Sequence, residues 1–170
     1  MDQSPCLAWV GLGSNQGNSL KILHQAQQAM SQLAVKPLQI SPIYKTDPWG
    51  YTQQDQFFNQ VIGLYTRYSA HQLLCSLLDI ESHFQRQRSI RWGPRTLDLD
   101  LLDYQNVVYQ QADLILPHPR LHLRRFVLQP WCDIAPHYYL NPYQATIKEL
   151  LQCCPDTSFI QKVSVFYSDL

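Results

Sequence analysis

Hydrophobic residues in the first part of the chain follow a strand-like and then a helix-like spacing. An apolar run at residues 7–12 predicts a short buried strand, and the glycine-rich stretch 11–15 predicts a tight turn with helix caps. Between Ile22 and Leu33 apolar residues recur every three or four positions. This spacing predicts an amphipathic helix.

The central part of the chain repeats this alternation. Residues 38–44 and 57–65 have the apolar content of strands, and the turn-rich stretch 46–50 lies between them. Ser69 with Gln72 forms a capping-box signature. We therefore expect a second amphipathic helix to begin there.

The order of the predicted elements indicates a fold class. Residues 96–104 alternate apolar and acidic side chains and predict a strand, and a short strand at 107–109, a turn at 117–120 and a last helix at 146–153 follow. The order strand, helix, strand, strand, helix, strand is that of a split βαβ unit. It predicts an α+β, ferredoxin-like α/β sandwich, with a mainly antiparallel sheet and helices packed on one face. The length of 170 residues suits a single domain, residues 1–170.

Composition narrows the class of protein. Hydrophobic residues make up 45% and charged residues 15%, as in globular proteins, and the formal net charge is zero. This balance gives no reason to expect a nucleic-acid or membrane partner. The chain shows no targeting signal and no membrane-length apolar run, so we expect a cytoplasmic protein. The five cysteines lack CxxC spacing, which favours free thiols over a zinc site or a disulfide framework.

Arginines are concentrated in one part of the sequence. Seven of the eight lie between Arg86 and Arg125, and none of the five lysines does. The guanidinium fork suits phosphate oxygens, so the cluster indicates a phosphate-rich ligand. Two alternatives are a solvated loop with scattered ion pairs, and pairing of the arginines with the nearby Asp98 and Asp100.

Asp98 and Asp100 alternate with leucines in the predicted strand. Successive side chains of a strand point to opposite faces, so the two carboxylates share one face, roughly 6.5 Å apart. Such a pair can hold magnesium, which prefers one or two carboxylates completed by water and phosphate oxygens. The alternative is a solvent-exposed strand face. We expect Asp103, on the opposite parity, to be a turn residue.

Several stretches of the sequence resemble the motifs of a known family. The ten residues Arg91-Trp-Gly-Pro-Arg-Thr-Leu-Asp-Leu-Asp100 are similar to the signature of 6-hydroxymethyl-7,8-dihydropterin pyrophosphokinase. Further matching motifs are Gly11–Asn15, Tyr44–Gly50, Phe57–Asn59, Glu81, Arg86 with Arg88, Pro117–Arg120 and Arg124–Phe126. They follow the family's order from about residue 8 to residue 136, and the last 30 or so residues carry no motif of the family.

The resemblance implies an ATP- and magnesium-dependent transfer of pyrophosphate to the pterin, an early step of folate biosynthesis. It implies that Asp98 and Asp100 hold two Mg²⁺ ions. It implies phosphate or nucleotide contacts for Arg86, Arg88, Trp92, Arg95, His118 and Arg124, with Arg86, Arg88 and Arg95 also acting in catalysis. It implies a pterin pocket formed by Thr46, Asp47, Pro48, Trp49, Phe57, Asn59, Trp92 and Phe126. ATP and the pterin are the expected partners, and we expect a monomer or weak dimer.

Several positions depart from the family pattern, and other functions stay open. Gln85 stands where a glycine is common, Trp49 is bulkier than usual, Phe57 lacks a tyrosine hydroxyl, and a basic residue is missing near Asp113. Acidic pairs also hold metals in nucleotide-sugar transferases, although these predict a longer α/β domain. A ferredoxin-like RNA-binding module would want exposed aromatics within basic strands. An inactive relative would be expected to have lost the acidic pair.

Overall fold

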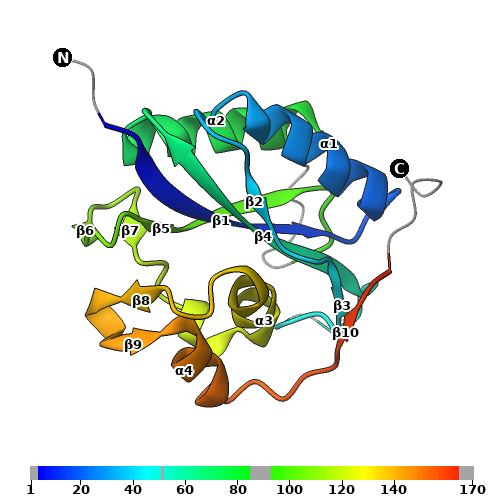
Figure 1. Ribbon diagram of the computed structural model, residues 1–170. Coiled ribbons are helices and arrows are strands. Elements are labelled where there is room, and N and C mark those ends of the chain that lie inside the picture. Colours follow the sequence, from blue (N-terminus) through cyan, green and yellow to red (C-terminus); the bar gives the residue numbers. More distant parts are fainter. Residues whose placement is uncertain (1–3, 51, 85–92, 165–170) are drawn as a thin grey trace.

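The computed structural model, which describes residues 4–50, 52–84 and 93–164, is built around an antiparallel sheet (Figure 1). The strand order is β10-β3-β4-β1-β5, and β2 also pairs with β4. The strands are β1 (Cys6–Ser14), β2 (Gln39–Ile40), β3 (Tyr44–Thr46), β4 (Phe57–Thr66), β5 (Asp98–Tyr104) and β10 (Ile160–Lys162). Every pairing among them is antiparallel, which confirms the predicted mixture of helices with an antiparallel sheet.

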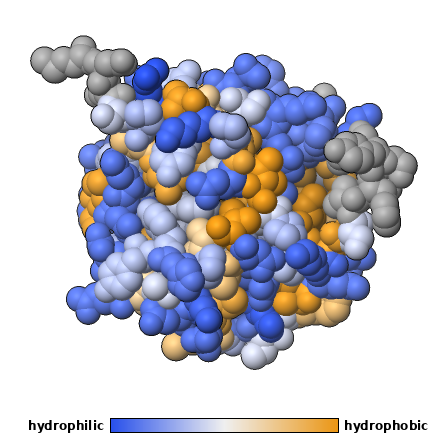
Figure 2. Space-filling view, viewed as in Figure 1, coloured by the Kyte–Doolittle hydropathy of each residue, from blue (hydrophilic) through white to orange (hydrophobic). Residues whose placement is uncertain are grey.

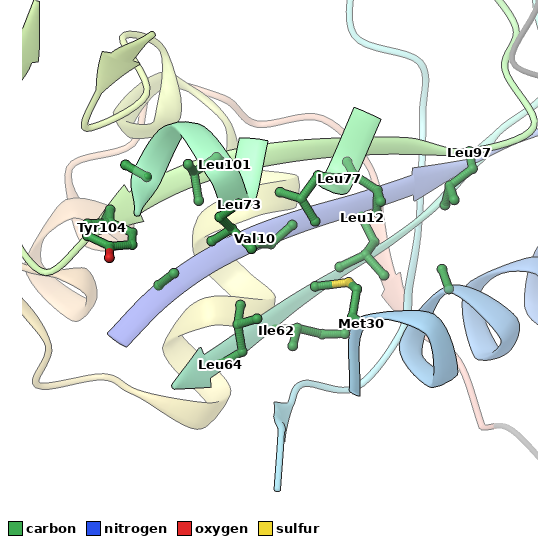
Figure 3. Close-up of a cluster of buried hydrophobic side chains, with 14 of the residues drawn as sticks. Val10, Leu12, Met30, Ile62, Leu64, Leu73, Leu77, Leu97, Leu101 and Tyr104 are labelled. Atoms are coloured by element: carbon green, nitrogen blue, oxygen red, sulfur yellow. The ribbon is translucent and has the colours of Figure 1, made fainter. Parts of the chain in front are cut away.

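Helices α1 (Ser19–Ser31) and α2 (Ala70–His83) cover one face of the sheet. The core there joins strand residues such as Val10 and Ile62 to Met30 of α1 and to Leu77 of α2 (Figure 3). The capping box of α2 forms as predicted. The cap of α1 differs from the prediction: the stretch 11–15 mostly continues β1, and Asn18 caps the helix after a turn at Gly17, which has φ of 71°.

A second layer of helices lies on the opposite face, so the expectation of helices on one face was wrong (Figure 1). It consists of α3 (Arg125–Ile134) and α4 (Ile147–Gln152), with the 3₁₀ turns Leu121–Leu123 and Asn141–Tyr143. Trp9 of β1 packs against Trp131 of α3, with ring centroids 5.2 Å apart. Gly63 leaves space for this indole, because a Cβ there would lie 2.7 Å from the Trp9 ring. Two small hairpins complete the chain: β6 (Tyr109–Gln110) with β7 (Ile115–Leu116), and β8 (Tyr139–Leu140) with β9 (Ala145–Thr146).

Asp103 lies inside β5, so its prediction as a turn residue was wrong. The pairing of β1 with β5 shifts between Trp9 and Val10, so Leu102 has no partner in β1 and Asp103, opposite Trp9, faces the α3 side of the sheet. The Asp103 side chain is fully buried and accepts a hydrogen bond from the Tyr138 hydroxyl at 2.7 Å. A bulge changes the parity of a strand, so strict alternation fails beyond it. Burial raises the pKa of the Asp103 carboxyl.

Hydrophilic residues cover much of the molecular face shown in Figure 2, and hydrophobic residues form scattered groups on it. Within residues 4–50, 52–84 and 93–164, no helix has the length and apolar character needed to span a membrane.

The buried carboxyl predicts a pH-dependent stability. Because the folded-state pKa of Asp103 is raised, wild-type stability falls as the pH rises from the ordinary carboxyl value, about 4, toward the raised value. Asp103→Asn should remove this loss, which amounts to about 1.4 kcal/mol of unfolding free energy for each unit by which the pKa is raised. Urea unfolding at pH 4 and pH 8 checks this: the variant should gain stability over wild type only at pH 8. Parallel stability curves would contradict the assignment.

Candidate active site

Three neighbouring strands bring predicted site residues together around Gly13, a position without a side chain. Gly13 in the central strand β1 pairs with Asn59 of β4 on one side and with Asp98 of β5 on the other. A Cβ at Gly13 would lie 3.1 Å from Oδ1 of Asn59 and 3.9 Å from both Cβ of Asp98 and a ring carbon of Phe57. Paired residues point to the same face, so these side chains converge on the α3 side of the sheet.

The acidic pair occupies this face, as the alternation along β5 predicts. Leu97, Leu99 and Leu101 are buried in the opposite core, whereas Asp98 and Asp100 are partly exposed. Each carboxylate has an arginine partner: Arg95 pairs with Asp98, and Nη1 of Arg124 lies 3.4 Å from Oδ2 of Asp100. The sequence left open that the arginines pair with Asp98 and Asp100. In this structure Arg95 and Arg124 do so.

Arg124 is a nearly buried cation at the centre of the site. It is the N-cap residue of α3, and its side chain is about 10% exposed. Its guanidinium carbon lies 5.2 Å from the Trp49 ring centroid and 5.6 Å from that of Phe126. Burial lowers the pKa of Arg124, and the nearby Asp100 opposes that shift. The aromatic faces and the carboxylate together compensate for the lost hydration of the cation.

The amide of Asn59 is fixed by a neighbouring strand. Its Nδ2 donates to Oγ1 of Thr46 at 2.7 Å, and both residues are buried. Asp47 follows at the surface, where its carboxylate accepts a hydrogen bond from Gln56 at 2.8 Å. The loop 46–49, which includes Pro48, thus begins beside Asn59 and ends with Trp49 beside Arg124.

His118 reaches the same region from the turn after β7. Burial, together with the positive charges of Arg124 and Arg120, lowers its pKa to about 4, so the imidazole is neutral at physiological pH. Its Nδ1 accepts the backbone N–H of Arg120 at 3.2 Å. The ring proton is therefore assigned to Nε2, which leaves one N–H donor.

Two buried polar residues that hold the site were not assigned a role from the sequence. Asn15 accepts the Arg95 backbone N–H at 2.8 Å and donates to Gln54 and to the carbonyl of Asp55. Glu81 accepts the backbone N–H of Leu99 at 2.6 Å, between the two aspartates. A signal for Glu81 was available, because a carboxylate continues the apolar i, i+4 row of Leu73 and Leu77.

The structure brings most of the predicted residues into one region. Thr46, Asp47, Trp49 and Phe126 line a shallow hollow, open to solvent, on the α3 side of the sheet, whereas Phe57, Asn59, Asp98 and Asp100 are not among its lining residues. Arg86, Arg88 and Trp92 lie outside the described residues. Across the described ranges, no group of three or more His, Cys, Asp or Glu side chains could hold a metal ion.

Comparison with known proteins identifies the family. The model of 7,8-dihydro-6-hydroxymethylpterin-pyrophosphokinase (HPPK) matches residues 9–136, about three-quarters of the chain. The chain belongs to the HPPK family. The Bacillus subtilis 2-amino-4-hydroxy-6-hydroxymethyldihydropteridine pyrophosphokinase is 41% identical over 130 residues, which cover 76% of this chain and 78% of that protein. The Methylorubrum extorquens protein of the same name is 36% identical over 157 residues, covering 92% and 98%.

Solved structures of HPPK proteins share the fold. The wild-type Plasmodium falciparum HPPK-DHPS structure with STZ-DHP aligns with a TM-score of 0.71 at 14% identity. It covers 88% of this chain, whereas this chain spans only 43% of that longer protein. At this identity the likeness concerns the fold alone.

The requirement for a residue without a side chain at Gly13 can be tested by comparing its substitution with that of Gly11, in the same strand. Gly13→Ala puts a methyl group 3.1 Å from the Asn59 amide oxygen, whereas Gly11→Ala makes only ordinary contacts, 3.5 Å or more, with Leu102. We expect Gly13→Ala to lower kcat/KM of the HPPK reaction roughly tenfold, as a displaced positioning group does. Gly11→Ala should stay within about twofold. Equal effects of the two substitutions would argue against convergence over Gly13.

Proposed function

We propose that this protein transfers a pyrophosphoryl group from ATP to 6-hydroxymethyl-7,8-dihydropterin and releases AMP and the pterin diphosphate, in folate biosynthesis. The proposal rests on one observation: Asp98 and Asp100 pair with Arg95 and Arg124 beside a hollow lined by aromatic residues. The chain that carries this arrangement belongs to the HPPK family. The Bacillus subtilis and Methylorubrum extorquens relatives are named for this pyrophosphokinase activity.

The pterin side of the pocket follows from the fixed polar and aromatic groups. Phe57 and Phe126 supply flat faces on which a heteroaromatic ring stacks favourably. The Asn59 amide, held by Thr46, offers a donor and an acceptor to the polar edge of the pterin. Phe57 lacks a hydroxyl, so its contribution is stacking alone. We assign Asp47, Pro48, Trp49 and Trp92 to the same pocket.

The phosphate side combines cations with the acidic pair. Asp98 and Asp100 fit Mg²⁺, because they are partly exposed oxygen donors on one face, two residues apart. When bound, magnesium supplies charge neutralisation of the phosphates and acidification of the attacking hydroxyl. Arg86, Arg88, Arg95 and Arg124 would bind phosphate oxygens, and neutral His118 would donate a hydrogen bond to a phosphate oxygen through its Nε2–H.

In this mechanism the chain's own residues position and shield the reactants. The pterin hydroxymethyl oxygen attacks the β-phosphorus of ATP, and the bond from that phosphorus to the oxygen of the AMP phosphate breaks. Ring stacking and the Asn59 amide orient the hydroxymethyl group for in-line attack. The arginines stabilise the charge that develops on the transferring and departing phosphates. We assign Trp92, Arg86 and Arg88 to closing the site against water.

We also propose the finer features of the architecture. The β1-α1-β3-β4-α2-β5 unit, with strand order β3-β4-β1-β5, supports a ferredoxin-like core within one domain over residues 1–170. A cytoplasmic location, a monomer or weak dimer, and ATP with the pterin as partners complete the proposal.

The reaction is tested by incubating the protein with ATP, magnesium and 6-hydroxymethyl-7,8-dihydropterin and separating the nucleotides. We expect AMP that depends on the pterin, with no ADP. ADP would indicate an ordinary kinase or ATPase, and the absence of any nucleotide product would indicate a binding protein.

The acidic pair can be tested by substitution. Asp98→Ala and Asp100→Ala should each lower kcat by roughly a thousandfold or more, in the range seen when a principal electrostatic group is removed. The affinity for pterin, measured by calorimetry without nucleotide, should remain nearly unchanged because Asn59 and the aromatic rings are intact. A variant with near-normal turnover would rule out the metal assignment.

A further inference from the structure

The segment after α4 lies outside the part of the chain that the family model matches, yet it contributes to the candidate active site. It passes the first turn of α3 and ends as β10 beside β3 (Figure 1). Loop 46–49 and the first turn of α3 form two walls of the hollow. A third wall consists of Asp156, Ser158, Phe159 and Ile160.

Asp156 caps α3 from a distant part of the sequence. Arg124, the N-cap residue, makes no side-chain hydrogen bond to the helix, because its guanidinium is a donor and is directed to Asp100. The backbone N–H of Arg125 instead donates to Oδ2 of Asp156 at 3.1 Å. A carboxylate at this position satisfies a free N–H and complements the helix dipole. It therefore fixes the turn that carries Arg124 and Phe126.

The same carboxylate organises the connection to the opposite wall. Its Oδ1 accepts the backbone N–H of Ser158 at 3.0 Å and also the Ser158 hydroxyl. The next residue, Phe159, accepts the backbone N–H of Asp47 at 3.3 Å through its carbonyl oxygen. Ile160 then pairs with Thr46 in the sheet. One short segment thus joins the first turn of α3 to the loop 46–49.

Phe159 lines the hollow, and the residue is 47% exposed. Trp49 and Phe126 line the same hollow, so the third wall adds an aromatic side chain to two others. A ring that stays half exposed at a pocket edge has apolar area left to bury when a flat ligand binds.

We propose that Asp156–Ile160 is the third wall of the pterin pocket. In it Asp156 is a positioning residue that sets the distance between loop 46–49 and the turn of Arg124 and Phe126, and Phe159 contacts the bound pterin. This assignment rests on the proposed function and names residues that the family motifs do not include.

The test compares three variants with a matched control. Asp156→Ala removes the cap. Asp156→Asn keeps one acceptor oxygen for the Arg125 N–H, but its amide faces Ser158 and cannot accept the Ser158 backbone N–H. Phe159→Ala keeps the cap and removes only the ring. Ser69→Ala is the control, because it removes the capping-box serine of α2, a comparable N-cap with no part in the hollow.

Steady-state kinetics with both substrates give the first measurement. Asp156→Ala should lower kcat/KM for the pterin roughly tenfold, with KM changing more than kcat, whereas Asp156→Asn should recover to within about threefold of wild type. Phe159→Ala should raise the KM for pterin about fivefold with kcat unchanged. Ser69→Ala should leave all constants within about twofold.

Hydrogen exchange gives a second measurement that does not depend on turnover. Asp156→Ala should accelerate exchange in peptides covering residues 44–50 and 124–130, and Ser69→Ala should not. A wild type that makes no AMP would overturn the proposed function, and the exchange result would still decide whether Asp156 positions both walls. Unchanged exchange, or equal kinetic effects of Asp156→Ala and Ser69→Ala, would overturn the inference.

Discussion

The site depends on a central strand that has no side chain where its neighbours' functional groups meet. β1 pairs with β4 on one side and with β5 on the other, and Gly13 lies between Asn59 and Asp98. A methyl group there would already crowd the Asn59 amide. The absence of a Cβ therefore permits a group suited to recognising a polar ring edge and a group suited to holding metal to occupy one face.

Charge balance is the second constraint on this face. Arg124 is almost buried, and a buried cation needs compensation by an anion or by aromatic faces. Asp100, Trp49 and Phe126 supply both. The acidic pair and the arginines thus neutralise one another in this structure, and the proposed mechanism requires these pairs to rearrange when a magnesium nucleotide binds. The same groups serve structural stability and the proposed chemistry, so their geometry is fixed by both.

Much of the candidate site could be predicted from sequence because its signals are local. The alternation over residues 97–101 placed Asp98 and Asp100 on one face, and the capping box at Ser69 located α2. The failures have long-range causes. The bulge that buries Asp103, the second helical layer on the α3 face and the cap that Asp156 gives to Arg125 all depend on residues distant in the chain. Periodicity carries no information about such contacts.

In the proposed function, Asp98 and Asp100 form the metal–nucleotide site. The most direct test is the number of Mn²⁺ ions bound per chain, measured by electron paramagnetic resonance with a non-hydrolysable ATP analogue. We expect two ions in the wild type and the loss of both in the Asp98→Asn/Asp100→Asn double variant, with thermal stability retained. Equal numbers and affinities of bound ions in the two proteins would contradict it.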